Sequence, residues 1–190
     1  MRSYQVDVRK LPIGYPTHLH SAQFWEQVGR TVASFGFLED VLLRAIVALT
    51  YTREVSDDEL EVETAEAANR LKKAVSDTLW PLIDEYVRLS KAHQAYPFSN
   101  LSDLEADLRS ATKLRNVIAH GSWRVPDEQG RSVPHFVNRQ GEAFETPVDI
   151  AFLQDLQQHT AELAAAVVNS ITLMGWAFPG TSGPGRRLLD

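Results

Sequence analysis

The 190-residue chain contains no cysteine, which excludes disulfide bonds and any catalysis or metal binding by thiolates. A reducing compartment, the cytoplasm, is therefore the expected location. Long uninterrupted apolar runs are also lacking, since polar side chains interrupt the most apolar stretch, residues 161–178. That stretch predicts a buried helix, and no membrane partner is expected. The N-terminal MRSYQVDVRKLP has no apolar segment, so no secretory signal is expected either.

Several short motifs with a known mechanism are missing as well. The sequence has no HExxH, CxxC or EF-hand pattern, and neither GxxxxGK[ST] nor GxGxxG occurs. The nucleophile motif GxSxG is absent too. We therefore expect no metal and no cofactor. His18 and His20 form a tempting ligand pair, but we interpret them as a chance pair in an N-terminal arm.

The charges are distributed unevenly along a chain whose formal net charge is −6. Residues 57–66 hold six acids and no base. The window from 109 to 139 reverses this balance, with two acids against six bases: Arg109, Lys113, Arg115, Arg124, Arg131 and Arg139. Two interpretations stay open for this window. It is either an ordinary solvated basic face or a local surface that binds anions on an otherwise acidic protein.

Helical spacing of apolar residues dominates the pattern. Residues 1–20 show no sustained period and predict an arm, whereas 21–52 predict a first helix with Ser21 as its N-cap. A second helix is expected over 64–95, kinked or split at Pro81. For the third, Ser102 is the expected N-cap, with Glu105 in the capping-box position.

The third helix is expected to stop at Gly121, with that glycine in the left-handed conformation. Two stretches of alternating residues around the turn-like DEQG then predict a β-hairpin within about 121–146. A last long helix is expected over 148–177, followed by a loose tail, 179–190. The predicted fold is all-α: one domain, residues 21–178, forming a four- or five-helix bundle with a small β-hairpin inserted before its last helix.

One residue breaks the pattern of the third helix. Arg115 lies within about 60° of the apolar positions Leu104, Leu108, Ala111 and Ile118, in the middle of the apolar stripe. A buried guanidinium without a partner would cost several kcal/mol, so an anion must meet it. Glu39 occupies a similar place on the apolar stripe of the first helix. The two could form one buried structural ion pair, or Arg115 could belong to a site.

A second stripe of polar residues runs along the same helix. Arg109, Lys113, Asn116 and His120 are spaced i, i+4, i+7 and i+11, within about 40° of one line. His120 at the helix end is by itself typical of a residue that interacts with the helix dipole. Its combination with Arg115 and Asn116 favours a site.

The segment Arg115-Asn116-Val117-Ile118-Ala119-His120 has the form R-x4-H, with a polar residue directly after the arginine and a glycine after the histidine. It resembles the signature of HEPN domains, all-helical proteins found in toxin–antitoxin and antiviral systems. The stretch FGFLEDVLLRAI, residues 35–46, also looks like the first helix of such proteins. The predicted hairpin departs from the plain bundle of that family.

The resemblance implies an endoribonuclease that needs no metal, in which the RNA 2′-hydroxyl attacks the adjacent phosphorus and leaves a 2′,3′-cyclic phosphate. Arg115, His120 and Asn116 are then the catalytic residues: histidine moves the proton, arginine stabilises the phosphorane charge, and asparagine orients the imidazole or binds the phosphate. The expected RNA-binding residues are the cations Arg109, Lys113 and Arg124, together with Trp123, which would stack on a base.

Because one histidine cannot serve easily as both acid and base, the resemblance also implies a homodimer with a composite site at its interface. An antitoxin or another regulatory protein is the further partner that such systems imply. Two alternatives remain: a catalytically inactive module of the same fold that binds RNA, a nucleotide or a protein, and a purely structural bundle in which Glu39 and Arg115 are a core ion pair.

Overall fold

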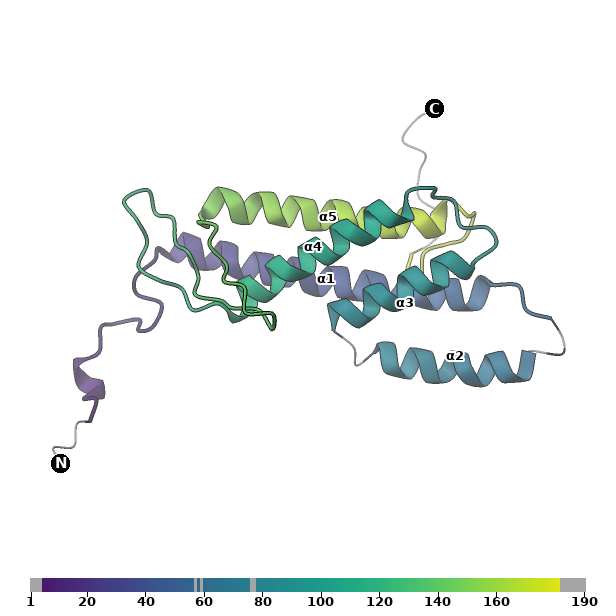
Figure 1. The fold of residues 1–190 in the computed structure, drawn as a ribbon, viewed down its shortest axis with the longest axis horizontal. Helices are drawn as coiled ribbons and strands as arrows, with labels where there is room; N and C mark the ends of the chain where they lie inside the picture. Colours follow the sequence, from purple (N-terminus) through teal and green to yellow (C-terminus); the bar gives the residue numbers. More distant parts are fainter. Residues whose placement is uncertain (1–4, 57, 59, 76–77, 182–190) are drawn as a thin grey trace.

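The computed structural model describes residues 5–56, 58, 60–75 and 78–181, and these residues form five α-helices after a short 3-10 helix, Val8–Lys10. The α-helices are α1 (Ala22–Thr52), α2 (Leu60–Ala74), α3 (Leu79–Ala92), α4 (Leu101–His120) and α5 (Ile150–Thr172). Figure 1 shows α5 lying along α1, while α4 crosses the pair obliquely and α3 lies near the C-terminal half of α1. The predicted all-α class is confirmed.

The first predicted helix is confirmed almost to the residue. The Oγ of Ser21 accepts a hydrogen bond from the backbone N–H of Phe24 at 3.1 Å, which is the expected N-cap geometry. Five of the apolar positions that define its period are buried: Phe24, Phe35, Leu42, Ile46 and Leu49. Val32 belongs to the same predicted stripe, but 46% of its surface is exposed.

The second predicted helix is split into α2 and α3. Pro81 is the third residue of α3, within the first turn, where a missing backbone donor costs little because that N–H would have no helical partner. Residues 76–77 of the connection, like Asp57 and Glu59 of the acidic stretch, lie outside the described residues.

The ends of α4 correct two predictions. The helix begins at Leu101 with Asn100 in the N-cap position, so Ser102 is not the N-cap, and Asn100 makes no side-chain capping bond. At the other end Gly121 has φ −67° and ψ 140°, an extended conformation and not the left-handed one. The chain continues outward from α4 instead of folding back over its last turn, which is why no left-handed residue is needed there.

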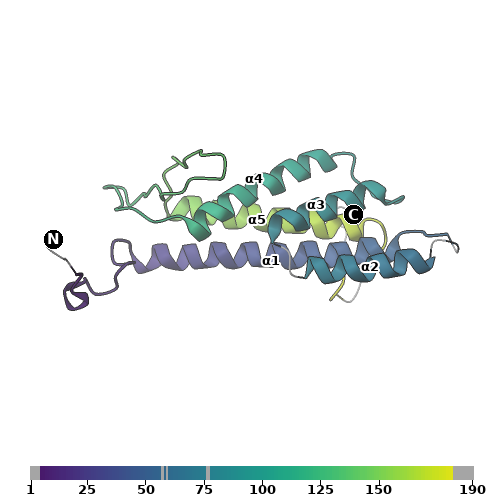
Figure 2. The ribbon, with the colours of Figure 1, turned by 60° about the horizontal axis from the view of Figure 1, so that its bottom comes forward.

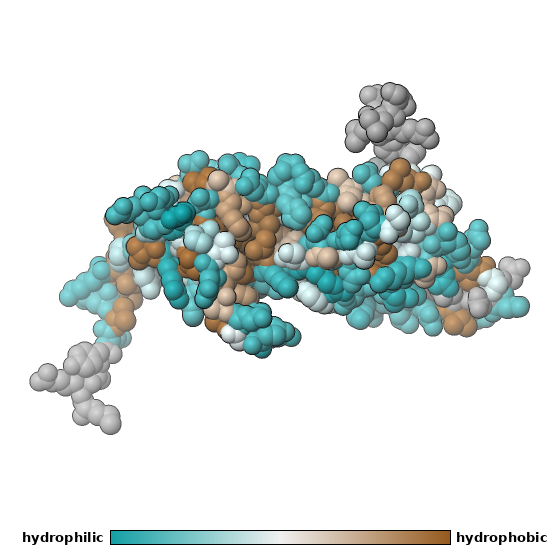
Figure 3. Space-filling model, turned by 45° about the horizontal axis from the view of Figure 1, so that its top comes forward, coloured by the Kyte–Doolittle hydropathy of each residue, from teal (hydrophilic) through white to brown (hydrophobic). Residues whose placement is uncertain are grey.

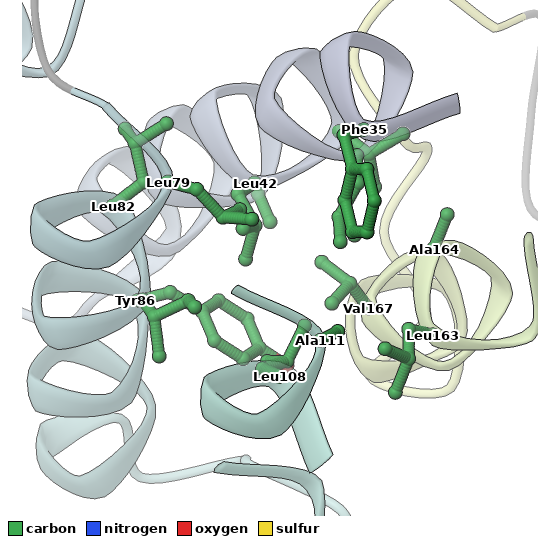
Figure 4. Packing of buried hydrophobic residues seen from close by; sticks show 14 of the residues in the cluster. Phe35, Leu42, Leu79, Leu82, Tyr86, Leu108, Ala111, Leu163, Ala164 and Val167 are labelled. Carbon is green, nitrogen blue, oxygen red and sulfur yellow. The ribbon is translucent and has the colours of Figure 1, made fainter. Parts of the chain in front are cut away.

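The core lies between α1, α3, α4 and α5. Figure 4 shows side chains from these helices pointing toward one another, among them Phe35 and Leu42 of α1, Tyr86 of α3 and Leu108 of α4. The hydroxyl of Tyr86 donates to the Oγ of Ser170 on α5 at 2.9 Å, so the largest buried polar group of the core is satisfied. Burial raises the pKa of this tyrosine well above its usual range.

The predicted β-hairpin over 121–146 is wrong for the described residues, which hold only isolated bridges: Ser122 with His135, Ser132 with Val148, and Val137 with Ala143. The expected turn at DEQG does form, because Asp127 Oδ1 accepts from the backbone N–H of Gln129 and Arg131. Prolines at 126, 134 and 147 remove backbone donors from the flanking stretches, so a continuous ladder cannot extend from that turn.

Among the described residues of the N-terminal arm, Thr17 is tied to the bundle by a hydrogen bond from Trp25 Nε1 to its carbonyl at 2.7 Å. Of the predicted tail, residues 182–190 lie outside the described residues. Hydrophilic side chains predominate on the face drawn in Figure 3, where apolar residues reach the surface in separate patches. Among the described helices, none combines the length and apolar character that crossing a membrane requires.

Candidate functional site

Arg115 lies where α4 packs on α1. Its Nη2 approaches Glu39 Oε1 at 3.5 Å, and its Nη1 donates to Asn116 Oδ1 at 3.3 Å. About a quarter of each charged side chain is exposed, 26% for Arg115 and 27% for Glu39. Charge-assisted bonds between nitrogen and carboxylate oxygen are usually about 2.7–2.9 Å, so both contacts are loose. The guanidinium is therefore partnered within one protomer, but it is neither sealed from solvent nor tightly held.

The neighbours of Arg115 on α4 match the predicted stripe. Leu108, Ala111 and Ile118 are almost completely buried, and Leu104 is 9% exposed. A long side chain whose backbone lies among buried positions can carry its charged head to the edge of the interface. The sequence thus placed Arg115 on the apolar side correctly, while its partial exposure depends on how α4 crosses α1.

His120 is the last residue of α4, and its side chain is exposed. It follows Arg115 by five residues, so the two backbone positions are about 7.5 Å apart along the helix axis and about 140° apart around it. Asn116 contacts the guanidinium of Arg115 and not the imidazole of His120. In this structure Asn116 therefore orients Arg115. The imidazole thus stands on the solvent side of the helix end.

Two contacts fix the direction in which the motif runs along α1. Arg115 meets Glu39, whereas Trp123, just beyond α4, packs edge-on against Phe24 with ring centroids 4.9 Å apart. His120 lies between these two anchors and therefore beside the N-terminal half of α1. The R-x4-H segment consequently flanks α1.

Gly121 makes this path possible. A Cβ built on it would lie 2.5 Å from the carbonyl oxygen of Val117 and 2.8 Å from the Cβ of Pro134, closer than real Cβ atoms come. The Gly121 N–H still donates to that Val117 oxygen at 2.8 Å, which finishes the helix. Glycine is required here for close approach rather than for a positive φ.

Arg109, predicted to bind RNA, is held by α3. Its Nη2 contacts Asp84 at 2.6 Å and Glu105 at 2.8 Å, and its guanidinium lies over the Trp80 ring, 4.7 Å from the centroid. The hydrogen bond to Glu105 is the main cause of its raised pKa. Two carboxylates already balance this charge, so Arg109 brings less attraction for a phosphate than its place in the sequence suggests.

The other predicted RNA-binding residues are differently placed. Lys113 is exposed on α4, and exposed Arg124 contacts the ring nitrogen Nδ1 of His135 at 3.0 Å. Trp123 is half-buried in a cluster with Phe24 and Trp25, whose ring centroids are 4.9 and 6.3 Å away. The basic segment thus offers exposed cations beside the motif, while its tryptophan is engaged in packing.

His20, which the sequence analysis interpreted with His18 as a chance pair, is packed into that aromatic cluster. His20 stacks on Phe24 with ring centroids 4.4 Å apart, and its Nε2 is buried without a hydrogen-bond partner among the described residues. Burial lowers its pKa. The ring also lines a cavity of about 330 Å³ at the N-termini of α1 and α5, next to Asp149. Only the neighbouring Phe24 and Trp25 hinted at this packing in the sequence.

His18 and His20 do not converge as a ligand pair. The His18 ring lies 5.7 Å from Tyr15, whereas His20 faces the aromatic cluster. Within the part of the chain that the structure describes, no three histidine or carboxylate side chains gather in a way that could hold a metal ion.

Comparison with known proteins assigns the chain to no family: no family model matches it, and neither a curated protein nor a solved structure shows significant similarity.

Proposed function

We propose that the protein is a HEPN-like endoribonuclease that needs no metal, acting as a toxin or antiviral effector, with Arg115 and His120 as its catalytic residues. The observation that carries the proposal is the loose contact between Arg115 and Glu39 at 3.5 Å, with both side chains partly exposed. A guanidinium held in this way can exchange its carboxylate for an RNA phosphate, because the phosphate offers shorter, bidentate contacts.

The reaction would proceed within the RNA itself. The 2′-hydroxyl oxygen attacks the adjacent phosphorus, the bond from phosphorus to the 5′-oxygen breaks, and a 2′,3′-cyclic phosphate and a free 5′-hydroxyl result. Arg115 would neutralise the charge that gathers on the phosphoryl oxygens, and Asn116 would hold the guanidinium in place through the 3.3 Å contact. His120 would accept the 2′-hydroxyl proton or donate one to the leaving oxygen.

The surroundings of His120 suit an RNA strand better than a small substrate. The residue is exposed at a helix end, and Lys113 and Arg124 supply cations on either side of it in the sequence. An exposed, linear arrangement can follow a polynucleotide backbone. The resemblance adds a second copy of the chain, whose motif would supply the acid or base that a single His120 lacks.

An inactive binding module of the same fold is the second candidate, and one observation favours it. Glu39 already contacts the guanidinium of Arg115, and Arg109 is balanced by Asp84 and Glu105. A surface whose arginines are partly neutralised can hold RNA, a nucleotide or an acidic partner such as an antitoxin without performing chemistry.

The deciding experiment incubates the purified protein with bulk RNA in the presence of a chelator and analyses the new ends. The nuclease produces 2′,3′-cyclic phosphates, and His120→Ala abolishes them while His18→Ala, at an exposed histidine of the N-terminal arm, leaves them unchanged. RNA binding without new ends, weakened by Lys113→Ala, would instead establish the binding module.

A further inference from the structure

The chain that leaves α4 turns back and brings a second histidine to the end of the motif. Figure 2 shows, as Figure 1 does, that the segment after α4 folds beside the C-terminal end of that helix, at the end of the bundle away from α2. Two backbone hydrogen bonds join Ser122 and His135 there. The Ser122 N–H donates to the His135 carbonyl at 3.0 Å, and the His135 N–H donates to the Ser122 carbonyl at 2.7 Å. His120 lies only two residues before Ser122 in the sequence.

The two histidines are close together and face the same side. Opposed Cα atoms of a hydrogen-bonded antiparallel pair are about 5.5 Å apart, and two residues of chain span about 7 Å at most. The Cα atoms of His120 and His135 therefore lie within roughly 13 Å of each other. Opposed residues also project their side chains on one face, so the His135 ring lies on the side of Ser122 and not of Trp123. His120, Ser122 and His135 are all exposed. Two imidazoles are thus available on the solvent side of the α4 end.

The backbone that carries His135 is fixed on both sides of that residue's segment. Ser132 is 2% exposed and exchanges two backbone hydrogen bonds of 2.9 Å with Val148, the residue before the N-cap of α5. Pro134 is buried, and its approach to Gly121 leaves no room for a Cβ at that position. The glycine that follows the motif histidine is therefore also the residue that allows His135 to lie beside it.

Arg124 determines which nitrogen of the His135 ring carries the proton. Its Nη2 lies 3.0 Å from Nδ1 of His135. A guanidinium can only donate hydrogen bonds, so Nδ1 is the acceptor, and the ring is neutral with its proton on Nε2. Unlike Arg109 and Arg115, Arg124 pairs with no carboxylate within the described part of the chain. Its charge is therefore available to an anion, and its present partner is the weaker, uncharged imidazole.

We propose that His135 is a second catalytic residue, the general acid that protonates the leaving 5′-oxygen while His120 deprotonates the 2′-hydroxyl. The role rests on the proposed function, because it serves the same cleavage. An RNA phosphate makes a charge-assisted contact with Arg124 that is stronger than the contact with a neutral imidazole. Phosphate binding therefore draws the guanidinium away from Nδ1 of His135. The ring then takes up a proton from water, as histidine does near neutral pH.

The proton transfers balance within one chain. The 2′-oxygen forms its bond to phosphorus as its proton passes to the imidazole of His120. The bond from phosphorus to the 5′-oxygen breaks, and that oxygen receives the proton from Nδ1 of the His135 imidazolium. His120 ends protonated and His135 neutral, and exchange with water restores both. One chain thus holds both an acid and a base, whereas a single imidazole cannot serve as both in one step.

Nitrogen NMR of protein with labelled histidines tests the exchange of Arg124 without catalysis. In the free protein, Nδ1 of His135 is expected to be unprotonated and Nε2 protonated. A single-stranded DNA oligonucleotide, which lacks the attacking 2′-hydroxyl, is expected to shift the Nδ1 signal toward the protonated position. An Nδ1 signal that stays unchanged at saturating oligonucleotide overturns the exchange.

Two RNA substrates with different leaving groups test the catalytic role. One carries an ordinary linkage at a position that the wild type cleaves, and the other carries a bridging sulfur in place of the 5′-oxygen there. A thiolate leaves without being protonated, so only the ordinary linkage needs a general acid. His135→Gln keeps an oxygen that can accept from Arg124. It is expected to cleave the ordinary linkage about 10²–10⁴-fold more slowly than the wild type, and the sulfur linkage at the wild-type rate. His120→Ala is expected to be slow on both.

The outcomes distinguish this role from the proposed function. If His135→Gln cleaves the ordinary linkage as fast as the wild type, or is equally slow on both substrates, His135 is not the general acid, although the nuclease itself stands. If the wild type makes no new ends in any RNA in the presence of a chelator, the proposed function is wrong and the role of His135 falls with it. His18→Ala is the matched control and is expected to cleave both substrates at the wild-type rate. Circular dichroism of each variant establishes that the fold is retained.

Discussion

The guanidinium of Arg115 on α4 meets the carboxylate of Glu39 on α1 at 3.5 Å, with about a quarter of each side chain exposed. This contact joins the residue that interrupts the apolar stripe of α4 to the corresponding residue of α1. The contact is loose, and it leaves the charged groups within reach of solvent. The same pair is therefore compatible with both a structural ion pair and a catalytic arginine. The free energy of unfolding that is lost when the pair is broken distinguishes the two hypotheses.

The first prediction concerns the balance between stability and activity at this pair. Because the contact is long and partly exposed, Arg115→Ala should lower the free energy of unfolding by about 1 kcal/mol or less, while cleavage of RNA falls below detection. Urea denaturation and an RNA-end assay measure the two effects. A loss of about 3–5 kcal/mol, the usual cost of breaking a buried ion pair, would support the structural bundle.

Removing the carboxylate of Glu39 should raise the affinity of the protein for RNA. In Glu39→Gln the guanidinium no longer has a charged competitor, so affinity for single-stranded RNA should rise several-fold, by about 1 kcal/mol. Fluorescence anisotropy with labelled RNA at fixed salt measures the change. Glu26→Gln, on the α1 surface and away from α4, is the matched control. Equal affinities for the wild type and Glu39→Gln would argue against phosphate exchange at Arg115.

His120 should matter for chemistry and not for folding. Its side chain is exposed at the end of α4, so His120→Ala should leave the urea midpoint unchanged while the cleavage rate falls by a factor of about 10²–10⁴, the usual contribution of general acid–base catalysis. Unaltered cleavage in the variant would eliminate the proposed role.

Gly121 should be sensitive to the smallest enlargement. The added Cβ of Gly121→Ala would press on the Val117 carbonyl and on Pro134, so the variant should lose about 1–3 kcal/mol of stability, as overpacked sites do. Ser122→Ala, at the exposed next residue, should change it little. Denaturant unfolding compares the two. An unaffected Gly121→Ala protein would mean that the segment after α4 can move away freely.

His20 should make the protein less stable in mild acid. Its pKa is lowered in the folded state by burial, so below the usual value of 6.5 the unfolded chain binds a proton that the folded chain resists. Stability is lost as the pH falls from that value toward the lower pKa of the folded state. Replacing His20 with Phe keeps the stacking on Phe24 and removes the titration. Thermal denaturation between pH 7.5 and pH 5.5 should therefore show a smaller loss in the variant, and identical losses would contradict the prediction.

The helices and the N-cap Ser21 were predictable because local spacing and capping decide them. The period of apolar residues identified α1, α4 and α5, and it placed Arg115 and Glu39 on facing stripes. The same reasoning overestimated the hairpin, since DEQG encodes a turn locally, but the prolines that flank it prevent a ladder. It also misassigned Gly121, whose small size is needed for contact with Pro134, thirteen residues further on in the sequence.

What the sequence determined by itself is thus the set of helices and the unusual position of one arginine, because these depend on neighbours within a few residues. Only the tertiary structure decided what each polar side chain meets. The crossing of α4 over α1 leaves about a quarter of the Arg115 side chain exposed beside Glu39, and the packing of α3 ties Arg109 to Asp84. Pairing across helices depends on crossing angles that no local pattern encodes, so the chemistry of this surface becomes visible only in three dimensions.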